Sequence, residues 1–378
     1  MEIYLDNSAT TIVCPEAAEA AMQAMTDNYG NPSALHSNGV RAKQLLEQSR
    51  QKVAAVLGAL PEEVLFSPSG TIANNTAVIA AVNMRRRRGS RIVTSSVEHP
   101  SVARVMDQLE AKGYDIVRLR PKLNGAVDPE EIMNAVNEKT ILVSLMYVNN
   151  ETGAINPVEY ARKAIKAAHS VALVHVDAIQ AFGKMSVKPR RIGADFLSIS
   201  GHKIHAPKGV GALYVKKGLI PPCHIYGGGQ ENGLFSGTEN MPAIAGFGAA
   251  CEVLPDPLTS QREMKKLRRR LLTKLSKIPT ILINSPNDAL PNIINMSILG
   301  MPSQVLVNFF SERGICISAG SACKKGHRSE VLTQLGYTPI RIDSAIRVSL
   351  SRYTTEEDID RFVEVAIEAS NKLRYREF

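Results

Sequence analysis

Between about Glu62 and Val215 the sequence alternates short apolar and β-branched runs with longer helical stretches. The run at 140–147, TILVSLMY, is of the kind found in strands inside parallel sheets. Strands that alternate with helices in this way predict an α/β fold with a largely parallel sheet. Because ligands of such sheets bind outside the carboxyl ends of the strands, the residues that follow each strand are expected to form any functional site.

Apolar runs and the turn residues between them locate the expected elements. Strands are predicted at 64–66, 91–95, 115–119, 140–147, 171–176, 196–199 and 211–215, and helices at 71–88, 100–112, 129–137 and 157–168. Beyond about residue 240 the pattern changes, with helices predicted at 240–254, 260–276, 302–313 and 354–373 and strands at 293–298 and 345–350. We therefore predict a large domain at 13–256 and a smaller α+β domain formed by 1–12 and 257–378.

Composition excludes several other classes of protein. The 378 residues suffice for two domains, and 44% apolar with 21% charged residues excludes a disordered chain, a collagen-like fibre and a disulfide-rich miniprotein. Apolar stretches such as 76–82 are far shorter than the roughly 20 residues that a membrane span needs. The opening MEIYLDNSATT has no basic or apolar leader pattern, so we expect a cytoplasmic protein without membrane association.

Basic residues outnumber acidic residues by 45 to 36, which gives a net charge of +9. They gather at Arg85–Arg88, at 262–274 and around Lys324, Lys325, His327 and Arg328. Solvated surface is the favoured interpretation of the first two clusters. An RNA-binding protein is the alternative, but no RNA module or stacking aromatic residues accompany these charges, so direct nucleic-acid binding is not expected.

Several side chains that could carry chemistry follow predicted strands or open the next helix, namely Thr71, His99, Asn150, Asp177 and Lys203. The lysine could form a Schiff base with an aldehyde cofactor, and the aspartate could pair with a protonated pyridine nitrogen. The helix start in SPSGT at 67–71 could bind a phosphate, and the histidine could stack on an aromatic ring. Taken alone, each residue has a structural alternative, such as a surface lysine or a helix cap. Their convergence on one edge of the sheet favours a site there.

The chain has an odd number of cysteines, five, and no CxxC pair, so neither a zinc site nor a disulfide framework is expected. Cys323 lies in ISAGSACKKGHR at 317–328, where small residues predict a mobile loop and basic neighbours would stabilise a thiolate. The alternative, an inert buried cysteine, fits Cys14, Cys251 and Cys316 better. Arg347 lies in an apolar strand, where a buried arginine needs an anionic partner such as a substrate carboxylate.

Motifs extend along nearly the whole chain. They are YLDNSATT at 4–11, GNPSALH at 30–36, EH at 98–99, VNNETG at 148–153, HVDAIQ at 175–180, SGHKIHAPKGVGALYV at 200–215, GGGQE at 227–231, SGT at 236–238, SAGSAC at 318–323 and IRVSLSRYTTEEDID at 346–360. This set resembles the pyridoxal-phosphate-dependent cysteine desulfurases of the class-V aminotransferase group, the NifS/IscS type. The resemblance implies an aspartate aminotransferase-like large domain with a mainly parallel sheet, a smaller α+β domain, pyridoxal 5′-phosphate and a homodimer.

The resemblance also implies an activity. L-cysteine would be converted to L-alanine, and the sulfur would pass as an enzyme persulfide to a sulfur-acceptor or iron–sulfur scaffold protein, for iron–sulfur cluster assembly or tRNA thiolation. The implied catalytic residues are Cys323, Lys203 and His99. The implied cofactor-binding residues are Gly70, Thr71, His99, Asn150, Asp177, Gln180, Ser200, His202, Lys203 and, towards the partner subunit, Thr238. Asn150 and Arg347 would bind the substrate carboxylate.

Three positions depart from the usual pattern of that group. Ile72 stands where a carboxylate is common, Phe235 stands where an arginine is common, and 324–328 replaces a stretch rich in serine and alanine. A class-V enzyme acting on another amino acid, such as a selenocysteine lyase or an aminotransferase, is the alternative enzymatic hypothesis.

Overall fold

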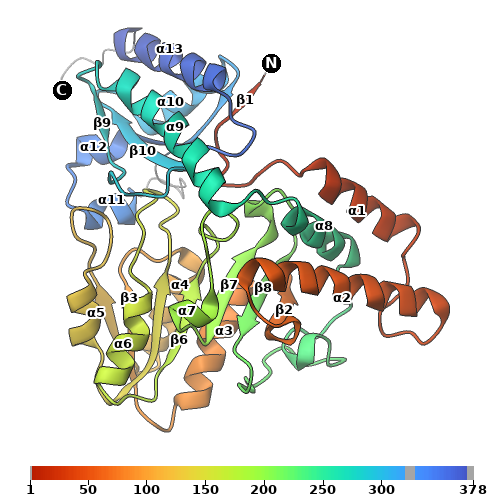
Figure 1. Ribbon diagram of the computed structural model, residues 1–378. Helices are drawn as coiled ribbons and strands as arrows, with labels where there is room; N and C mark the ends of the chain where they lie inside the picture. Colours follow the sequence, from red (N-terminus) through yellow and green to blue (C-terminus); the bar gives the residue numbers. More distant parts are fainter. Residues whose placement is uncertain (1, 320–327, 373–378) are drawn as a thin grey trace.

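Seven strands form a central sheet in the order β2-β8-β7-β6-β5-β3-β4 (Figure 1). Their bounds are β2 (Val64–Ser67), β3 (Arg91–Ser95), β4 (Asp115–Leu119), β5 (Thr140–Met146), β6 (Leu173–Asp177), β7 (Phe196–Ser200) and β8 (Gly211–Val215). The computed structural model describes residues 2–319 and 328–372. Strands β3 to β7 are mutually parallel, whereas β8 runs antiparallel to both β7 and β2. The predicted α/β fold with a largely parallel sheet is therefore confirmed.

Helices cover this sheet, and several of them begin at a side-chain cap. Their bounds are α1 (Pro15–Thr26), α2 (Ser37–Leu57), α3 (Gly70–Arg85), α4 (Pro100–Ala111), α5 (Pro129–Ala135), α6 (Glu159–Ala167), α7 (Pro189–Ile192) and α8 (Met241–Glu252). At α3 the Ser69 side chain accepts a hydrogen bond from Ile72 N, and at α4 the His99 side chain accepts from Ser101 N. Both caps follow strands directly, so the helix starts lie at the edge of the sheet where a ligand is expected.

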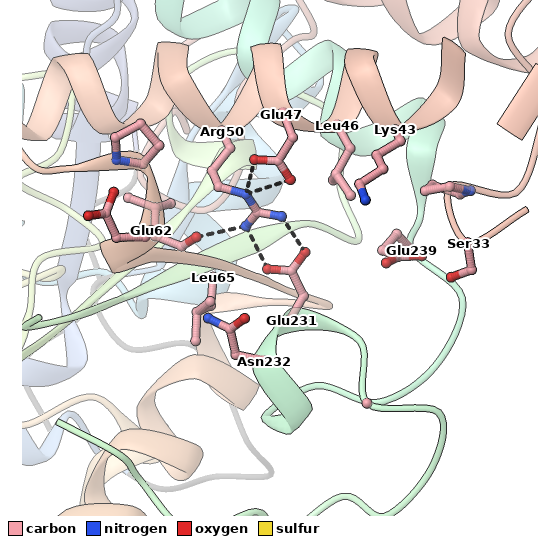
Figure 2. Close-up of a pocket in the computed structure, with 14 residues that line it drawn as sticks. Ser33, Lys43, Leu46, Glu47, Arg50, Glu62, Leu65, Glu231, Asn232 and Glu239 are labelled. Atoms are coloured by element: carbon pink, nitrogen blue, oxygen red, sulfur yellow. Dashed lines mark hydrogen bonds and ion pairs between the residues drawn. The ribbon is translucent and has the colours of Figure 1, made fainter. Parts of the chain in front are cut away.

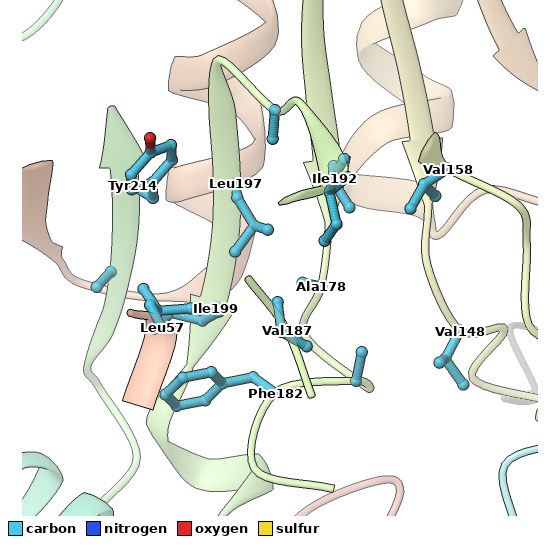
Figure 3. Close-up of a cluster of buried hydrophobic side chains, with 14 of the residues drawn as sticks. Leu57, Val148, Val158, Ala178, Phe182, Val187, Ile192, Leu197, Ile199 and Tyr214 are labelled. Carbon is cyan, nitrogen blue, oxygen red and sulfur yellow. The ribbon is translucent and has the colours of Figure 1, made fainter. Parts of the chain in front are cut away.

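Adjacent residues of the strands point to opposite faces of the sheet, and both faces are buried. On one face Val93, Val143 and Leu197 join a large apolar cluster that includes Phe182 and Tyr214, part of which Figure 3 shows. Their chain neighbours on the opposite face join a second cluster, among them Ile92, Leu142 and Phe196. Burial on both faces explains why these strands read as continuous apolar runs instead of alternating patterns.

A four-stranded antiparallel sheet, β12-β13-β10-β9, forms the other part of the molecule. The elements here are β1 (Ile3–Tyr4), α9 (Pro257–Leu275), β9 (Ile281–Ile283), β10 (Ile293–Ile298), α10 (Ser303–Ser311), β11 (Ile315–Cys316), β12 (Ser318–Ala319), α11 (Glu330–Gln334), α12 (Pro339–Asp343), β13 (Ala345–Ser349) and α13 (Glu356–Lys372). Strand β1 pairs in parallel with β11, and Asp6 forms a bridge to Ser349. The beginning of the chain therefore lies against its C-terminal part. The division into domains at 13–256 and at 1–12 with 257–378 stays a prediction.

The two basic clusters differ in their surroundings. Arg86–Arg88 at the end of α3 are exposed, as predicted for a solvated surface. In α9, however, Arg268 is buried and donates to the carbonyls of Ile293 and Pro286. Three further cations of α9 pair with Glu356 and Asp360 of α13, namely Lys266, Arg270 and Lys274. The prediction of a solvated surface therefore holds for most cations of α9, which are exposed or partly exposed, and is wrong for the buried Arg268.

The cysteines inside the described residues are free thiols. Cys14 and Cys251 are buried, as expected, and burial raises the pKa of the Cys251 thiol. Cys316, on the short strand β11, is only partly buried, so the expectation of a buried thiol is wrong there. Cys323 lies outside the described residues. None of the helices within 2–319 and 328–372 is long and apolar enough to cross a membrane.

Candidate active site

A cavity of about 370 Å³ lies at the carboxyl ends of the central strands. It is lined by ten of the site residues predicted from sequence, namely Gly70, Thr71, His99, Asn150, Asp177, Gln180, Ser200, His202, Lys203 and Arg347. Four strands of the parallel set and the starts of α3 and α4 deliver nearly all of them, as the rule for parallel sheets predicts. Arg347 is the exception, because it comes from β13 of the second sheet.

Asp177 ends β6 and is almost fully buried. One carboxylate oxygen accepts from Asn74 Nδ2 at 2.7 Å, and the other accepts from the Ile179 backbone N–H at 3.0 Å. Burial raises the pKa of Asp177, while the neighbouring His99 and Lys203 oppose that rise. The hydrogen bonds therefore fix the carboxylate in one orientation, where it can face a cationic ring nitrogen.

Lys203 follows β7 in the short helical turn at Gly201–Lys203. Its Nζ donates to the carbonyls of Ser8 and Ala9 at 2.6 and 2.7 Å. Burial, with the charge of Arg347 as the next contribution, lowers the pKa of Lys203 to about 8. A larger fraction of the amine is therefore uncharged near neutral pH than for an ordinary lysine, and attack on an aldehyde requires the uncharged form.

His99 opens α4 and lies beside the hydrogen-bonded group around Asp177. Its Nδ1 accepts from Ser101 N at 3.1 Å and lies 2.8 Å from Ser101 Oγ. Asn74 Nδ2 donates both to Ser101 Oγ and to Asp177. Because Nδ1 accepts a backbone N–H, the neutral imidazole carries its proton on Nε2.

The part of the cavity at the start of α3 is suited to an anion. The N-terminus of α3 begins at Gly70 and Thr71, and helix N-termini favour negative charge. Ser200 Oγ is buried without a hydrogen-bond partner among the described residues. An added Cβ at Gly70 would lie 2.4 Å from Ile179 Cδ1 and 3.2 Å from Ser200 Cβ, so glycine keeps this corner open. Burial lowers the pKa of His202 to about 4, which leaves it a neutral hydrogen-bonding group.

Arg347 already has an anionic partner that the sequence analysis did not name. Its Nη2 lies 3.0 Å from Asp6 Oδ1, and its Nη1 donates to the Asn150 carbonyl at 2.8 Å. The Nε atom is buried without a hydrogen-bond partner among the described residues. Asp6 therefore balances the arginine charge, and the free donor remains for a ligand.

Two predicted residues are not among those that line the cavity. Thr238 is exposed on the segment between β8 and α8, and Cys323 lies outside the described residues. The segment with Thr238 is held by a buried ion pair in which Arg50 of α2 contacts Glu231 at 2.7 and 2.9 Å (Figure 2). Glu231 also accepts from Phe66 N of β2. Glu231 and Asn232 both have positive φ, so this ion pair stabilises a strained backbone.

Phe235, one of the departures from the family pattern, is buried in the apolar cluster that contains Phe196 and Leu213. It therefore anchors the segment from the side of the core.

Sequence reasoning missed several residues around the cavity. Ser8 and Ala9 line it and hold Lys203, and Ser69, Met146, Val148, Ile179 and Ser318 also line it. Ser8 and Ala9 belong to YLDNSATT, which was noted as a motif but not assigned to the site. The motif itself was the available signal, and the parallel pairing of β1 with β11 brings it there.

Glu98, directly before His99, is a buried carboxyl group with unequal oxygens. Oε1 accepts from Ser95 Oγ at 2.5 Å and from Met146 N at 3.0 Å, while Oε2 is buried without a hydrogen-bond partner among the described residues. Burial raises the pKa of Glu98 to about 8. The group is therefore mostly protonated at neutral pH in the folded protein.

This leads to a stability prediction for Glu98→Gln. The folded state keeps the proton up to pH about 8, whereas the unfolded chain releases it near its ordinary pKa of about 4.3, so the wild-type free energy of unfolding falls as pH rises between these values. Glutamine carries no such proton, so the variant should lose this decline and be more stable at pH 8 by on the order of 3 kcal/mol. Urea unfolding at several pH values from 5 to about 8.5 measures the effect.

Glu63→Gln is a matched control of opposite sign. Hydrogen bonds from Leu60 N and Lys217 N, together with Arg190, hold the pKa of Glu63 below its ordinary value despite burial. Its contribution is present above the unfolded pKa and is lost as pH falls, so this variant should be less stable than wild type at neutral pH. If the free energy of unfolding depended on pH equally in wild type and in Glu98→Gln, this would contradict a protonated Glu98 in the folded protein.

Comparisons with known proteins bear on the whole chain. The sequence model of the family described as Aminotransferase class-V matches residues 3–362. A cysteine desulfurase of Trichormus azollae is 42% identical over 377 residues, which cover 98% of this chain and 94% of the relative. A cysteine desulfurase IscS of Methanosarcina thermophila is 38% identical over 376 residues, which cover 98% of this chain and 93% of the relative.

Solved structures of similar proteins share the fold of this chain. A NifS-like protein superposes with a TM-score of 0.92 at 36% identity, covering 98% of this chain and 100% of the neighbour. A protein described as SspA in complex with cysteine superposes with a TM-score of 0.82 at 31% identity, covering 94% of this chain and 100% of the neighbour. The predicted fold class is confirmed by these likenesses.

Proposed function

We propose that this chain, which belongs to the class-V aminotransferase family as a NifS/IscS-type cysteine desulfurase, converts L-cysteine to L-alanine and retains the sulfur as a persulfide on Cys323. The sulfur–carbon bond of cysteine breaks and a sulfur–sulfur bond forms on the enzyme thiol. In the net reaction, the proton that this thiol loses is gained by the methyl group of the alanine that leaves. The observation that carries this proposal is the arrangement of Lys203, Asp177 and Arg347 around one cavity.

The residues present fit pyridoxal 5′-phosphate. Phosphate would lie at the start of α3, against Gly70, Thr71, His202 and the unpartnered Ser200 hydroxyl. The Asp177 carboxylate, fixed by Asn74, would pair with the pyridine nitrogen. When bound, the cofactor supplies an aldehyde for amines and an electron-withdrawing ring for the substrate α-carbon.

Lys203 would attach the cofactor and then move a proton at the substrate α-carbon. Its contacts with Ser8 and Ala9 hold the amine in place, and its lowered pKa, about 8, lets Nζ both accept and return a proton near neutral pH. His99 would cover one face of the ring. Its Nε2–H, fixed by the Ser101 contacts to Nδ1, would serve as a proton donor.

Arg347 and Asn150 would bind the substrate carboxylate. Arg347 Nε has no hydrogen-bond partner among the described residues, whereas Nη1 already donates to the Asn150 carbonyl and Nη2 to Asp6. An anion beside Nε would remove a buried unsatisfied donor. This fixes the amino acid with its amine towards Lys203 and with its side chain free for attack by a thiol.

We propose a homodimer in which Thr238 contacts the phosphate of the partner subunit. Large apolar side chains are exposed on α1, on the segment between α1 and α2, on the start of α2 and on the segment after β8, namely Met22, Met25, Tyr29, Leu35, Val40, Ile220 and Tyr226. Figure 1 places α1 and α2 on one side of the molecule, with the segment after β8 beneath α2. Such a patch is typical of a subunit interface. Sedimentation equilibrium tests this, and a monomer at micromolar concentration would contradict it.

Sulfur would pass from Cys323 to an acceptor protein, for iron–sulfur cluster assembly or tRNA thiolation. We place the reaction in the cytoplasm, because a persulfide carrier needs a compartment that keeps thiols reduced. Fractionation of cells that produce the protein tests its location.

A product assay with L-cysteine tests the activity. Purified protein reconstituted with pyridoxal phosphate should release alanine and sulfide in equal amounts when a reducing thiol is present, and sulfide production should increase with a suitable acceptor protein. Formation of a keto acid in place of alanine would overturn the proposal in favour of an aminotransferase. A strict requirement for selenocysteine would overturn it in favour of a selenocysteine lyase.

A further inference from the structure

Lys184 is a buried lysine directly behind the active site. It lies four positions after Gln180 in the segment that follows β6, and Lys184 is only 9% exposed. Its Nζ donates to Gln180 Oε1 at 3.0 Å. Among the residues that the structure describes, its electrostatic neighbours are the cations Lys203 and Arg347 and not a carboxylate. Burying an amine against a neutral amide has an energetic cost, so its position calls for a reason.

The amide of Gln180 connects Lys184 with the active-site lysine. Gln180 Nε2 donates to the Ser8 carbonyl at 3.0 Å, and Lys203 Nζ donates to that same carbonyl at 2.6 Å. Lys184, Gln180, Ser8 and Lys203 therefore form a continuous series of hydrogen bonds that ends at the cavity.

Lys184 determines the orientation of the Gln180 amide, that is, which side its oxygen and its nitrogen occupy. A lysine amine offers N–H donors to the amide oxygen, whether it is charged or neutral. Burial, followed by the charges of Lys203 and Arg347, lowers the pKa of Lys184 to about 7, and both forms keep a donor. A reversed amide would set its NH₂ against this amine and its oxygen against the Ser8 carbonyl. The contact of the two oxygens is repulsive whatever the protonation state of Lys184, and the contact of the NH₂ with the amine is repulsive whenever the amine is charged, so the NH₂ group stays on the side of Ser8.

The resemblance to the cysteine desulfurases implies that Gln180 contacts the phenolic oxygen of the bound pyridine ring. We propose that Lys184 is a positioning residue for this contact, because its amine fixes the Gln180 amide with the NH₂ towards the cavity. One N–H of Gln180 is taken by Ser8, and the second remains for the ligand, since Gln180 lines the cavity. The inference rests on the proposed function, because the ring oxygen is that of pyridoxal phosphate. Lys184 would therefore influence the charge on the ring oxygen of the cofactor without contacting the cofactor.

Lys184→Met tests this, because methionine keeps the length of the side chain and removes the donor. The dissociation constant for pyridoxal phosphate, measured by equilibrium dialysis, should rise roughly three- to tenfold, the effect of one hydrogen bond. The pH midpoint of the visible absorption band should also move upward, because a ring oxygen that has lost a donor holds its proton more tightly. Lys184→Gln, which keeps an N–H donor, should restore part of both properties.

A double-mutant cycle separates positioning from a merely structural role. Gln180→Ala should show the same two changes, and Lys184→Met combined with Gln180→Ala should add little beyond either single variant. The control is Lys188→Met, which removes a comparable lysine bond to the Val56 carbonyl away from the cavity and should leave both readouts unchanged. In cofactor-free protein, the Gln180 side-chain NH₂ resonances should broaden in Lys184→Met and stay sharp in Lys188→Met.

The inference is overturned if Lys184→Met keeps the wild-type dissociation constant and pH midpoint, or if its effects add to those of Gln180→Ala. If Lys184→Met does not fold, Lys184→Gln decides, since loss of cofactor affinity in a folded variant that retains a donor would contradict the role. Cofactor binding is measured without cysteine. Failure of the product assay would therefore contradict the proposed activity and leave this test unaffected.

Discussion

Lys203→Ala should lower turnover of cysteine by on the order of 10³-fold or more, because it removes both the attachment point of the cofactor and the base that moves the α-proton. The carbonyls of Ser8 and Ala9 lose their common donor, yet the cavity and its phosphate end stay intact. Pyridoxal phosphate should therefore still bind, but without a covalent bond. Borohydride treatment followed by mass spectrometry should find the cofactor attached to wild-type protein and not to the variant.

The pH dependence of attachment provides a second check on Lys203. Because its pKa is lowered to about 8, the rate at which cofactor-free wild type captures the aldehyde should rise through this pH and level off above it. Lys208→Ala is the matched control, since Lys208 is exposed in the same loop and does not line the cavity. Turnover should be unchanged in the control. Comparable loss in both variants would mean that loop integrity, and not the amine of Lys203, supports activity.

Sequence patterns sufficed for the central sheet and most of the cavity because both depend on local signals. The strands at 91–95, 115–119 and 211–215 match β3, β4 and β8 residue for residue. Residues placed after parallel strands necessarily meet at one edge, so ten predicted site residues line one cavity. The antiparallel direction of β8 was not predicted, because a buried apolar run carries no sign of its direction.

The parts that were missed depend on contacts between distant residues. Arg347 pairs with Asp6 across 341 positions, and Arg50 pairs with Glu231 across 181 positions. No local pattern distinguishes Arg50 from the exposed cations of α2, so nothing marked it as the anchor of the segment that carries Thr238. The burial of Arg268 in α9 also depends on contacts that are distant in sequence, because this side chain donates to carbonyls of another segment.

Cys323→Ala is expected to abolish sulfur transfer while leaving the cofactor in place, an effect of at least about 10²-fold on sulfide release because nucleophilic catalysis is lost. Cys323 lies outside the described residues, but one residue that precedes it lines the cavity and one that follows it contacts a turn beside the cavity. Ser318 lines the cavity, and Ser329 donates to the Glu151 carboxylate, which belongs to the turn that also carries Asn150. The visible band and the pyridoxal phosphate affinity of this variant should match wild type.

A single turnover with cysteine separates this role from a general loss of function. Wild type should gain the mass of one sulfur atom on Cys323, and a reducing thiol should remove it, whereas Cys323→Ala should gain none and form no alanine. Cys223→Ala is the control, because Cys223 is a partly buried thiol bonded to the Ile225 carbonyl and does not line the cavity. Alanine formation at the wild-type rate in Cys323→Ala would require another sulfur acceptor and would overturn the assignment of the thiol. Loss of activity in Cys223→Ala alone would move the persulfide to that residue.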